Sequence, residues 1–185
     1  MSQSAVRAMA ELPPSRQFGR GLMSLSGVGG KASEEDAFKW FSLAAAQGHD
    51  GAQRYVGDMY FAGTGATQSF SKAARWYEKA ACCGNSKAAF KLATMCEDGL
   101  APNHSSLQDA YKWYRTAAQA GYPPAQHSLG RFLETGKGVE RNEKEALKWY
   151  QSAADQGCEG SLLRVFVLSN PHAEVKHRRL RSSTM

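Results

Sequence analysis

The chain has 185 residues, of which 42% are hydrophobic and 22% are charged. These values are typical of globular proteins. The lengths of the apolar runs exclude a membrane-spanning chain, because none approaches the ~20 residues that cross a bilayer. The longest run, Leu162 to Leu168, contains Arg164, and residues 1–12 lack the apolar core of a secretory signal. We expect a cytoplasmic location, with organelle targeting by a weak N-terminal peptide as an alternative.

The formal net charge of +6 is concentrated at the C-terminal end. Residues 171–185 hold four basic side chains against one acid, Glu174, so this tail supplies +3, half of the total. The net charge therefore does not indicate a basic nucleic-acid-binding face. We expect a solvated, disordered tail. Nuclear import or nucleic-acid contact through the tail is the alternative, and its basic residues are Lys176, Arg178, Arg179 and Arg181.

Residues 1–15 show no periodicity and are predicted to be a flexible lead-in. The next segment, Arg16–Ser26, has the place of a first helix, and Gly27-Val28-Gly29 is typical of a turn after it. Gly19 and Gly21 lie inside this segment, and each costs about 1 kcal/mol relative to alanine in a helix. We expect this helix to match the following pattern least well.

From Ser33 onward a helical pattern recurs four times, each time with a tryptophan that is followed eight residues later by glycine. The tryptophans are separated by 36, 37 and 36 residues, which predicts an array of structural repeats. Alanine lies three residues before and four after each tryptophan, on the same helix face, and a second aromatic ring directly follows it. We interpret the tryptophans as the structural core of the repeats: Trp40, Trp76, Trp113 and Trp149.

Each copy also carries signals for the beginning and the end of a helix. Seven residues before each tryptophan is a side chain that can accept a hydrogen bond from a free helix N–H. In three copies an acid follows three residues later and favours the positive helix end. The glycines supply the left-handed residue that ends a helix. The predicted N-caps are Ser33, Ser69, Ser106 and Asn142, and the acids are Asp36, Asp109 and Glu145.

A second kind of helix, the A helix, precedes each of the last three tryptophan-containing B helices. Five residues after its first alanine is a small residue, where we expect two helices to approach closely. Each A helix and the following B helix form a hairpin of about 36 residues that must stack on its neighbours. The A helices begin near Ala52, Ala88 and Ala125, have Gly57, Ala93 and Gly130 as small residues, and end at Gly63, Gly99 and Gly136. The predicted repeats are 16–48, 49–84, 85–121 and 122–157, followed by a terminal helix at 158–170.

The combined pattern is A-x-x-x-Φ-small-x-x-Φ-x-x-G, a short loop, then A-x-x-W-[FY]-x-x-A-A-x-x-G, where Φ is a large apolar residue. This signature, found over about residues 16–170, resembles the Sel-one-like repeat family, which is related to tetratricopeptide repeats. The chain departs from it at Arg20 and Ser24 in the first repeat and at Leu100-Ala101-Pro102-Asn103 in the third. The resemblance implies an all-α, right-handed α-solenoid whose A helices line a concave surface, and an adaptor that assembles protein complexes.

A tetratricopeptide-like geometry implies that the concave surface is formed two, six and nine residues after each A-helix alanine. These positions are mixed in charge and include two aromatic rings, which suits an extended or helical peptide. The predicted partner-binding residues are Arg54, Asp58, Phe61, Phe90, Thr94, Glu97, His127, Arg131 and Glu134. We therefore predict a noncatalytic scaffold that binds a protein or peptide and has no small-molecule substrate.

Motifs for catalysis, nucleotides and metals match poorly. Gly27-Val28-Gly29-Gly30-Lys31 resembles a phosphate loop, but Ala32 replaces the residue that binds magnesium and no strand precedes it. The four cysteines do not recur at one repeat position, so we expect reduced thiols. Histidines and cysteines lack metal-ligand spacing, and we predict no cofactor and no metal. The alternative is a hydrolase or redox enzyme that uses Cys82, Cys83 and His127.

Overall fold

The computed structural model describes residues 11–102 and 106–170, and all regular structure within them is helical. The helices are α2 (Pro14–Ser26), α3 (Glu34–Ala46), α4 (Asp50–Ala62), α5 (Phe70–Cys82), α6 (Ser86–Glu97), α7 (Leu107–Gln119), α8 (Pro123–Thr135), α9 (Glu143–Ala154) and α10 (Glu159–Ser169). None of the helices in these ranges is long and apolar enough to cross a membrane. The predicted tail and the first ten residues of the predicted lead-in lie outside the described residues.

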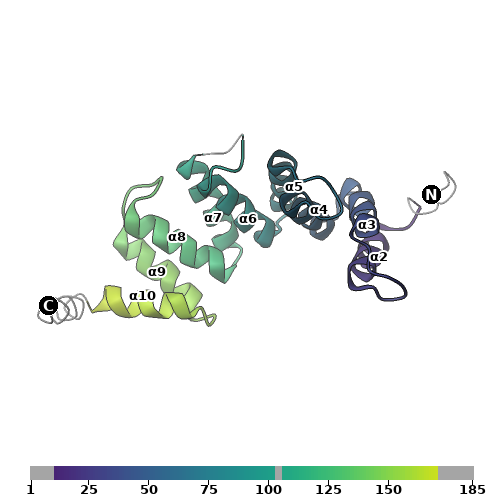
Figure 1. Cartoon of the computed structure of the whole chain (residues 1–185). Helices are drawn as coiled ribbons and strands as arrows, with labels where there is room; N and C mark the ends of the chain where they lie inside the picture. The colour runs from purple at the N-terminus through teal and green to yellow at the C-terminus, as the bar shows by residue number, and fades with distance from the viewer. Residues whose placement is uncertain (1–10, 103–105, 171–185) are drawn as a thin grey trace, which may run out of the picture. The chain divides into compact units, whose positions relative to one another are not determined.

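The chain divides into two compact units, Met1–Ser105 and Ser106–Met185. In the first unit α2 packs on α3, α3 on α4, α4 on α5 and α5 on α6. In the second unit α7 packs on α8, α8 on α9 and α9 on α10 (Figure 1). The even-numbered helices are the A helices and the odd-numbered ones are the B helices. Packing of each helix on the next one within its unit is typical of repeat arrays and confirms the predicted all-α repeat architecture.

The predicted N-caps begin all four B helices. Each of these side chains accepts a hydrogen bond from the backbone N–H three residues later, at 3.0–3.4 Å. Two of the acids bond to the cap side chain: the Ser106 hydroxyl donates to Asp109 at 2.5 Å, and the Asn142 amide donates to Glu145 at 3.3 Å. Among the A helices, α4 and α8 end at left-handed glycines, Gly63 and Gly136, as predicted.

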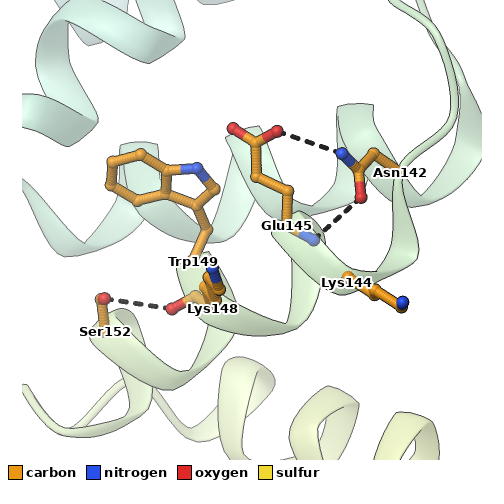
Figure 2. Close-up of a pocket in the computed structure, with 6 residues that line it drawn as sticks. All are labelled: Asn142, Lys144, Glu145, Lys148, Trp149 and Ser152. Atoms are coloured by element: carbon orange, nitrogen blue, oxygen red, sulfur yellow. Dashed lines mark hydrogen bonds between the residues drawn. The ribbon is translucent and has the colours of Figure 1, made fainter.

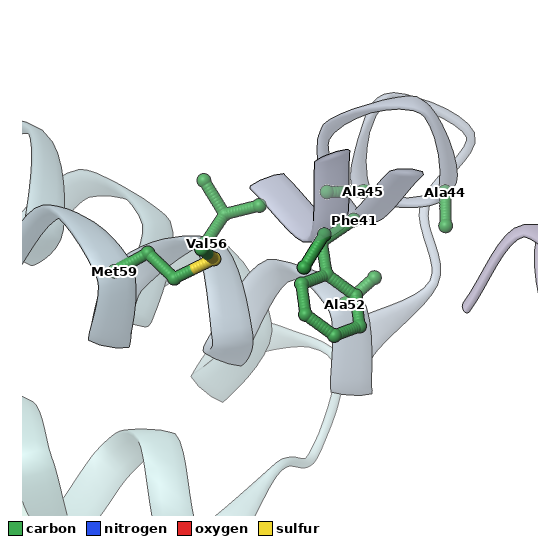
Figure 3. Close-up of a cluster of buried hydrophobic side chains, with 7 residues drawn as sticks. Phe41, Ala44, Ala45, Ala52, Val56 and Met59 are labelled. Atoms are coloured by element: carbon green, nitrogen blue, oxygen red, sulfur yellow. The ribbon is translucent and has the colours of Figure 1, made fainter. Parts of the chain in front are cut away.

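The buried ring of each B helix is the residue after the tryptophan. Phe41, Tyr77, Tyr114 and Tyr150 are at most 1% exposed, whereas all four tryptophans are only half-buried. The tryptophans predicted as core residues, Trp40, Trp76, Trp113 and Trp149, are less buried than this ring, and Trp76 packs against the edge of the first core. Two indoles carry a cation on one face, with Arg20 5.9 Å from the Trp40 ring and Lys79 4.5 Å from the Trp76 ring. In the first core Phe41 lies among alanines of α3 and residues of α4 (Figure 3).

The small residue of the A helix receives this ring. A Cβ atom on Gly57 would lie 2.7 Å from Cδ1 and Cε1 of Tyr77, and one on Gly130 would lie 2.9 Å from the same atoms of Tyr150. In the first hairpin Gly21 faces Phe41 in the same way, at 2.4 Å. The predicted close approach of two helices is confirmed at Gly57 and Gly130. It also gives Gly21 a packing role that offsets its low helix propensity.

Helix α10 has a different residue at the receiving position. Five residues after Ser161, which corresponds to the first alanine of the other A helices, is Phe166, and its side chain is 59% exposed. Leu162 and Leu163 on the same helix are also more than half exposed. At the receiving position α10 therefore has a large exposed ring where the earlier A helices have a small buried residue.

A pair of glutamines joins the A helix to the end of the B helix in two hairpins. Gln47 donates to Oε1 of Gln17 at 2.9 Å, and Gln156 donates to Oε1 of Gln126 at 2.8 Å. In the second hairpin Gln53 has the A-helix position, but Cys83 stands at the position of Gln47 and Gln156. Within the described residues, no group donates to the buried Oε1 of Gln53. The cysteine thus leaves one acceptor of this hairpin without the partner that the equivalent acceptors have.

Candidate partner-binding surface

Six of the predicted partner-binding residues lie in the first unit, on α4 and α6. None of these side chains is buried, and an ion pair of 3.1 Å between Lys91 on α6 and Asp58 on α4 joins the two helices. We call this set the first A-helix surface: Arg54, Asp58, Phe61, Phe90, Lys91, Thr94 and Glu97. The two A helices are thus tied together at Asp58, a predicted residue, through Lys91, which was not predicted.

Asp58 is the centre of a polar cluster on this surface. Its carboxylate pairs with Arg54 at 2.5 Å and with Lys91 at 3.1 Å, and it accepts a hydrogen bond from the Tyr77 hydroxyl at 2.7 Å. Burial, followed by the charge of Asp58, raises the pKa of Tyr77 well above its usual range. Because its oxygens are engaged by three neighbours, Asp58 fixes the positions of two cations on the surface.

The aromatic residues of the first surface differ in exposure. Phe61 is 37% exposed, and its ring centroid lies 5.4 Å from that of Phe70 at the start of α5. Phe90 is half-buried. Thr94 donates its hydroxyl hydrogen to the carbonyl oxygen of Phe90 at 2.8 Å, so this donor is used within α6. Phe61 is therefore the predicted apolar anchor most available to a partner.

The second unit carries the other three predicted residues, all on α8 and all half-buried: His127, Arg131 and Glu134. Glu134 pairs with Arg164 of α10 and accepts a hydrogen bond from the Tyr150 hydroxyl at 2.8 Å. The Arg131 guanidinium lies 5.3 Å from the ring centroid of Phe132. We call His127, Arg131, Glu134 and Arg164 the second A-helix surface.

Two tyrosines of the core support the two surfaces in the same way. Tyr77 bonds to Asp58 and Tyr150 to Glu134, and each carboxylate also pairs with a cation on the next A helix. The carboxylates come from different positions, six residues after Ala52 and nine after Ala125. The two cations, Lys91 and Arg164, both lie three residues after the start of the A-helix pattern. Sequence reasoning missed them, although this shared spacing was a signal that could have found them.

Burial and charge also act on two ionisable groups of the second surface. Burial raises the pKa of the Tyr150 hydroxyl to about 12. Burial, followed by the charges of Arg131 and Arg164, lowers the pKa of His127. The imidazole is therefore mostly neutral at neutral pH, and its Nδ1 lies 2.8 Å from Oγ of Ser161 on α10.

A shallow open hollow of about 530 Å³ lies on the B helix α9. Figure 2 shows Trp149 and Glu145 on one side of the helix and Lys144 pointing away. Ser152 donates to the carbonyl oxygen of Lys148 at 3.0 Å. None of the predicted partner-binding residues lines this hollow, and its indole is consistent with the partial exposure of the tryptophans.

The described cysteines and histidines do not form a metal site. No group of three or more histidine, cysteine or acidic side chains suited to a metal ion occurs in residues 11–102 and 106–170. Cys82 and Cys83 are exposed at the end of α5, Cys96 is buried, and all four cysteines are free thiols.

Parts of this chain are similar to known proteins. Over 46 residues it is 52% identical to the chitin synthase regulator SKT5 of Saccharomyces cerevisiae, and this match covers 25% of this chain and 7% of that protein. Over 70 residues it is 39% identical to DAP3-binding cell death enhancer 1 of Rattus norvegicus, and this match covers 38% of this chain and 14% of that protein. The chain thus spans only a small part of these relatives.

Solved structures show the same fold. A protective antigen of uropathogenic Escherichia coli with an SLR fold superimposes with a TM-score of 0.82 at 31% identity, over 86% of this chain and 34% of that one. A Sel1 repeat protein of Oxalobacter formigenes gives a TM-score of 0.77 at 31% identity, over 82% and 62% of the two chains. The Sel1 repeat model matches at residues 17–49, 51–85, 86–122 and 123–158. This chain therefore belongs to the Sel1 repeat family.

Proposed function

We propose that this chain is a noncatalytic protein-interaction scaffold that binds a peptide segment of a partner protein on its A-helix surfaces. The observation that carries the proposal is the pair of polar clusters around Asp58 and Glu134. The Asp58 cluster holds one cation from each of two consecutive A helices, Arg54 and Lys91, and the partly exposed ring of Phe61 lies on the same surface. In the Glu134 cluster the carboxylate on α8 pairs with Arg164 of the next A helix. Side chains that are already fixed lose less conformational entropy on binding.

The chemistry of the first surface fits a peptide with both an apolar and an acidic residue. Phe61 offers an exposed ring, and the side chain of Lys91 is 45% exposed although it pairs with Asp58. A small number of such anchors typically supplies most of the binding energy. The name of one relative describes a regulator and that of another describes a protein that binds DAP3, which supports a role in protein binding.

A peptide-display selection against the full chain tests the proposal. Selected peptides are measured on the parent and on a triple variant, Arg54→Ala, Phe61→Ala and Lys91→Ala. We expect affinity to fall at least about tenfold, because losing an interface anchor typically costs more than about 1.4 kcal/mol.

A matched control removes two arginines and one apolar side chain from exposed positions on the B helices: Arg75, Leu107 and Arg115. It is expected to bind like the parent. Equal losses in both triple variants would contradict a site on the A helices.

Deletion of residues 172–185 tests the alternative of nucleic-acid contact through the tail. We expect this deletion to leave peptide affinity unchanged. Nucleic-acid binding that depends steeply on salt and is abolished by the deletion would favour the alternative.

A further inference from the structure

Cys158, Ser161 and His127 form a continuous hydrogen-bonded chain in the second unit. Oγ of Ser161 lies 3.3 Å from Sγ of Cys158 and 2.8 Å from Nδ1 of His127. Cys158 directly precedes α10 and is partly exposed, whereas Ser161 is fully buried. A nucleophilic sulfur near the surface is thus joined through a buried hydroxyl to a basic ring nitrogen.

These residues depart from the rest of the repeat array. At the position of Ser161 the other clearly patterned A helices have alanine: Ala52, Ala88 and Ala125. At the position of Cys158, His49 and Asn85 accept hydrogen bonds from the backbone of their own helices, whereas Tyr122 and Cys158 make no side-chain cap bond. The thiol is therefore engaged with the hydroxyl and not with the helix end.

The hydroxyl has a single hydrogen and cannot donate to both neighbours at once. When it donates to Nδ1 of a neutral His127, the thiol hydrogen of Cys158 is directed to Oγ of Ser161. When it donates to Sγ, Nδ1 carries a hydrogen and donates to Oγ. When Nε2 keeps its hydrogen, the change from the first arrangement to the second moves one proton from sulfur to imidazole and leaves a thiolate beside an imidazolium, which is the transfer that activates a thiol nucleophile.

We propose that Cys158 is a nucleophilic modification site for α,β-unsaturated carbonyl compounds, with His127 as general base acting through Ser161. The sulfur forms a bond to the β-carbon while the thiol proton passes to Ser161 and the Ser161 proton passes to His127. The electron pair of the C=C bond moves to the enolate, the Ser161 hydroxyl gives its proton to the α-carbon, and the imidazolium of His127 returns its proton to the Ser161 oxygen. The product is a thioether, with no leaving group and no second reactant.

Acrylamide is a simple probe of this class, and the exposed Cys82 and Cys83 are internal references. The folded full-length chain is alkylated for short times, and the modified peptides are quantified by mass spectrometry. We expect Cys158 to react about tenfold faster than either reference although it is less exposed. A thiol present entirely as thiolate would react roughly 30-fold faster than an ordinary thiol, because an ordinary thiol is already a few per cent ionised at neutral pH. A rate below both references would overturn the proposal.

Two variants separate the relay from mere accessibility. Ser161→Ala introduces the residue of the other A helices, and His127→Phe introduces the residue that Phe90 provides at the equivalent position, so both are expected to fold. Each is expected to lower the ratio of the Cys158 rate to the Cys82 rate about tenfold, with circular dichroism melts showing the fold intact. An unchanged ratio in either variant would show that the hydroxyl and the imidazole play no part.

Discussion

Hairpin two (α4 and α5) and hairpin four (α8 and α9) have the same apolar packing but differ in the hydrogen bonds between their helices. In both, a tyrosine ring lies against a glycine of the A helix, and the tyrosine hydroxyl bonds to an A-helix carboxylate. The glutamine pair is complete in hairpin four, whereas Cys83 leaves it open in hairpin two. The repeat therefore fixes where the ring and its receiving glycine lie, whereas the glutamine hydrogen bond between the two helices is present in one hairpin and absent from the other.

The ring after the tryptophan is expected to be the most sensitive position of both hairpins. Tyr77→Ala and Tyr150→Ala should each lower the free energy of unfolding by about 3–5 kcal/mol, because a buried ring is replaced by a cavity. Trp76→Ala should cost clearly less because its indole is half-buried. Denaturant unfolding of the three variants measures this. A Trp76→Ala loss as large as that of Tyr77→Ala would restore the tryptophans as the core residues.

Filling the receiving site should have the next largest effect. Gly57→Ala would place Cβ 2.7 Å from the Tyr77 ring, and overpacking of this kind costs about 1–3 kcal/mol. Gly130→Ala should cost slightly less, because its Cβ would lie 2.9 Å from Tyr150.

The control for this prediction is Gly19→Ala in α2. A Cβ atom there meets nothing within 4 Å, so thermal melts should show a stabilisation of about 0.5–1 kcal/mol from helix propensity alone. If Gly57→Ala stabilises the chain like Gly19→Ala, the close contact with the ring does not constrain the hairpin.

Exchanging the residues that distinguish the two hairpins should change stability in opposite directions. Cys83→Gln supplies a donor for Oε1 of Gln53 and should raise the free energy of unfolding by about 0.5–1.5 kcal/mol. Gln156→Cys removes the donor to Gln126 and should lower it by about 1 kcal/mol. Cys83 and Gln47 have nearly the same backbone angles, so a glutamine fits at position 83. Chemical denaturation of both variants provides the test, and a destabilising Cys83→Gln would contradict the missing-donor explanation.

A further effect leaves stability at neutral pH unchanged and is confined to high pH. Burial raises the pKa of Tyr150 to about 12 and shifts that of Tyr77 in the same direction, whereas unfolded tyrosines ionise near about 10. The folded chain therefore keeps protons that the unfolded chain loses. This contribution is fully present below pH ~10 and is lost as pH rises through the folded values. Ultraviolet titration should show a step near pH ~12 for Tyr150, and Tyr150→Phe should remove it.

The sequence predicted local structure well because its signals act over a few residues. Ser33, Ser69, Ser106 and Asn142 cap their helices as expected, and the close approach at Gly57 and Gly130 occurs as expected.

The identity of the buried ring could not be read from periodicity, since the tryptophan and the residue after it both border the same apolar sector. The small residue of the A helix selects between them, and this is a tertiary contact.

The site was only partly predictable for a related reason. Counting from the A-helix alanines located Arg54, Asp58 and Glu134, but it could not show that both carboxylates are engaged by tyrosines and by cations of the next A helix. The missing donor for Oε1 of Gln53 was not predicted, because it depends on Cys83, 30 positions away, and appears only when equivalent positions of different hairpins are compared.

Phe166 has a consequence for anyone who wishes to lengthen this array by grafting modules. A tyrosine from an added B helix would meet a large ring on α10 where α4 and α8 offer glycine. A designer would first have to replace Phe166 with glycine or alanine, or choose an incoming helix with a small residue facing it. The Phe166 side chain thus determines which added helices can pack on α10.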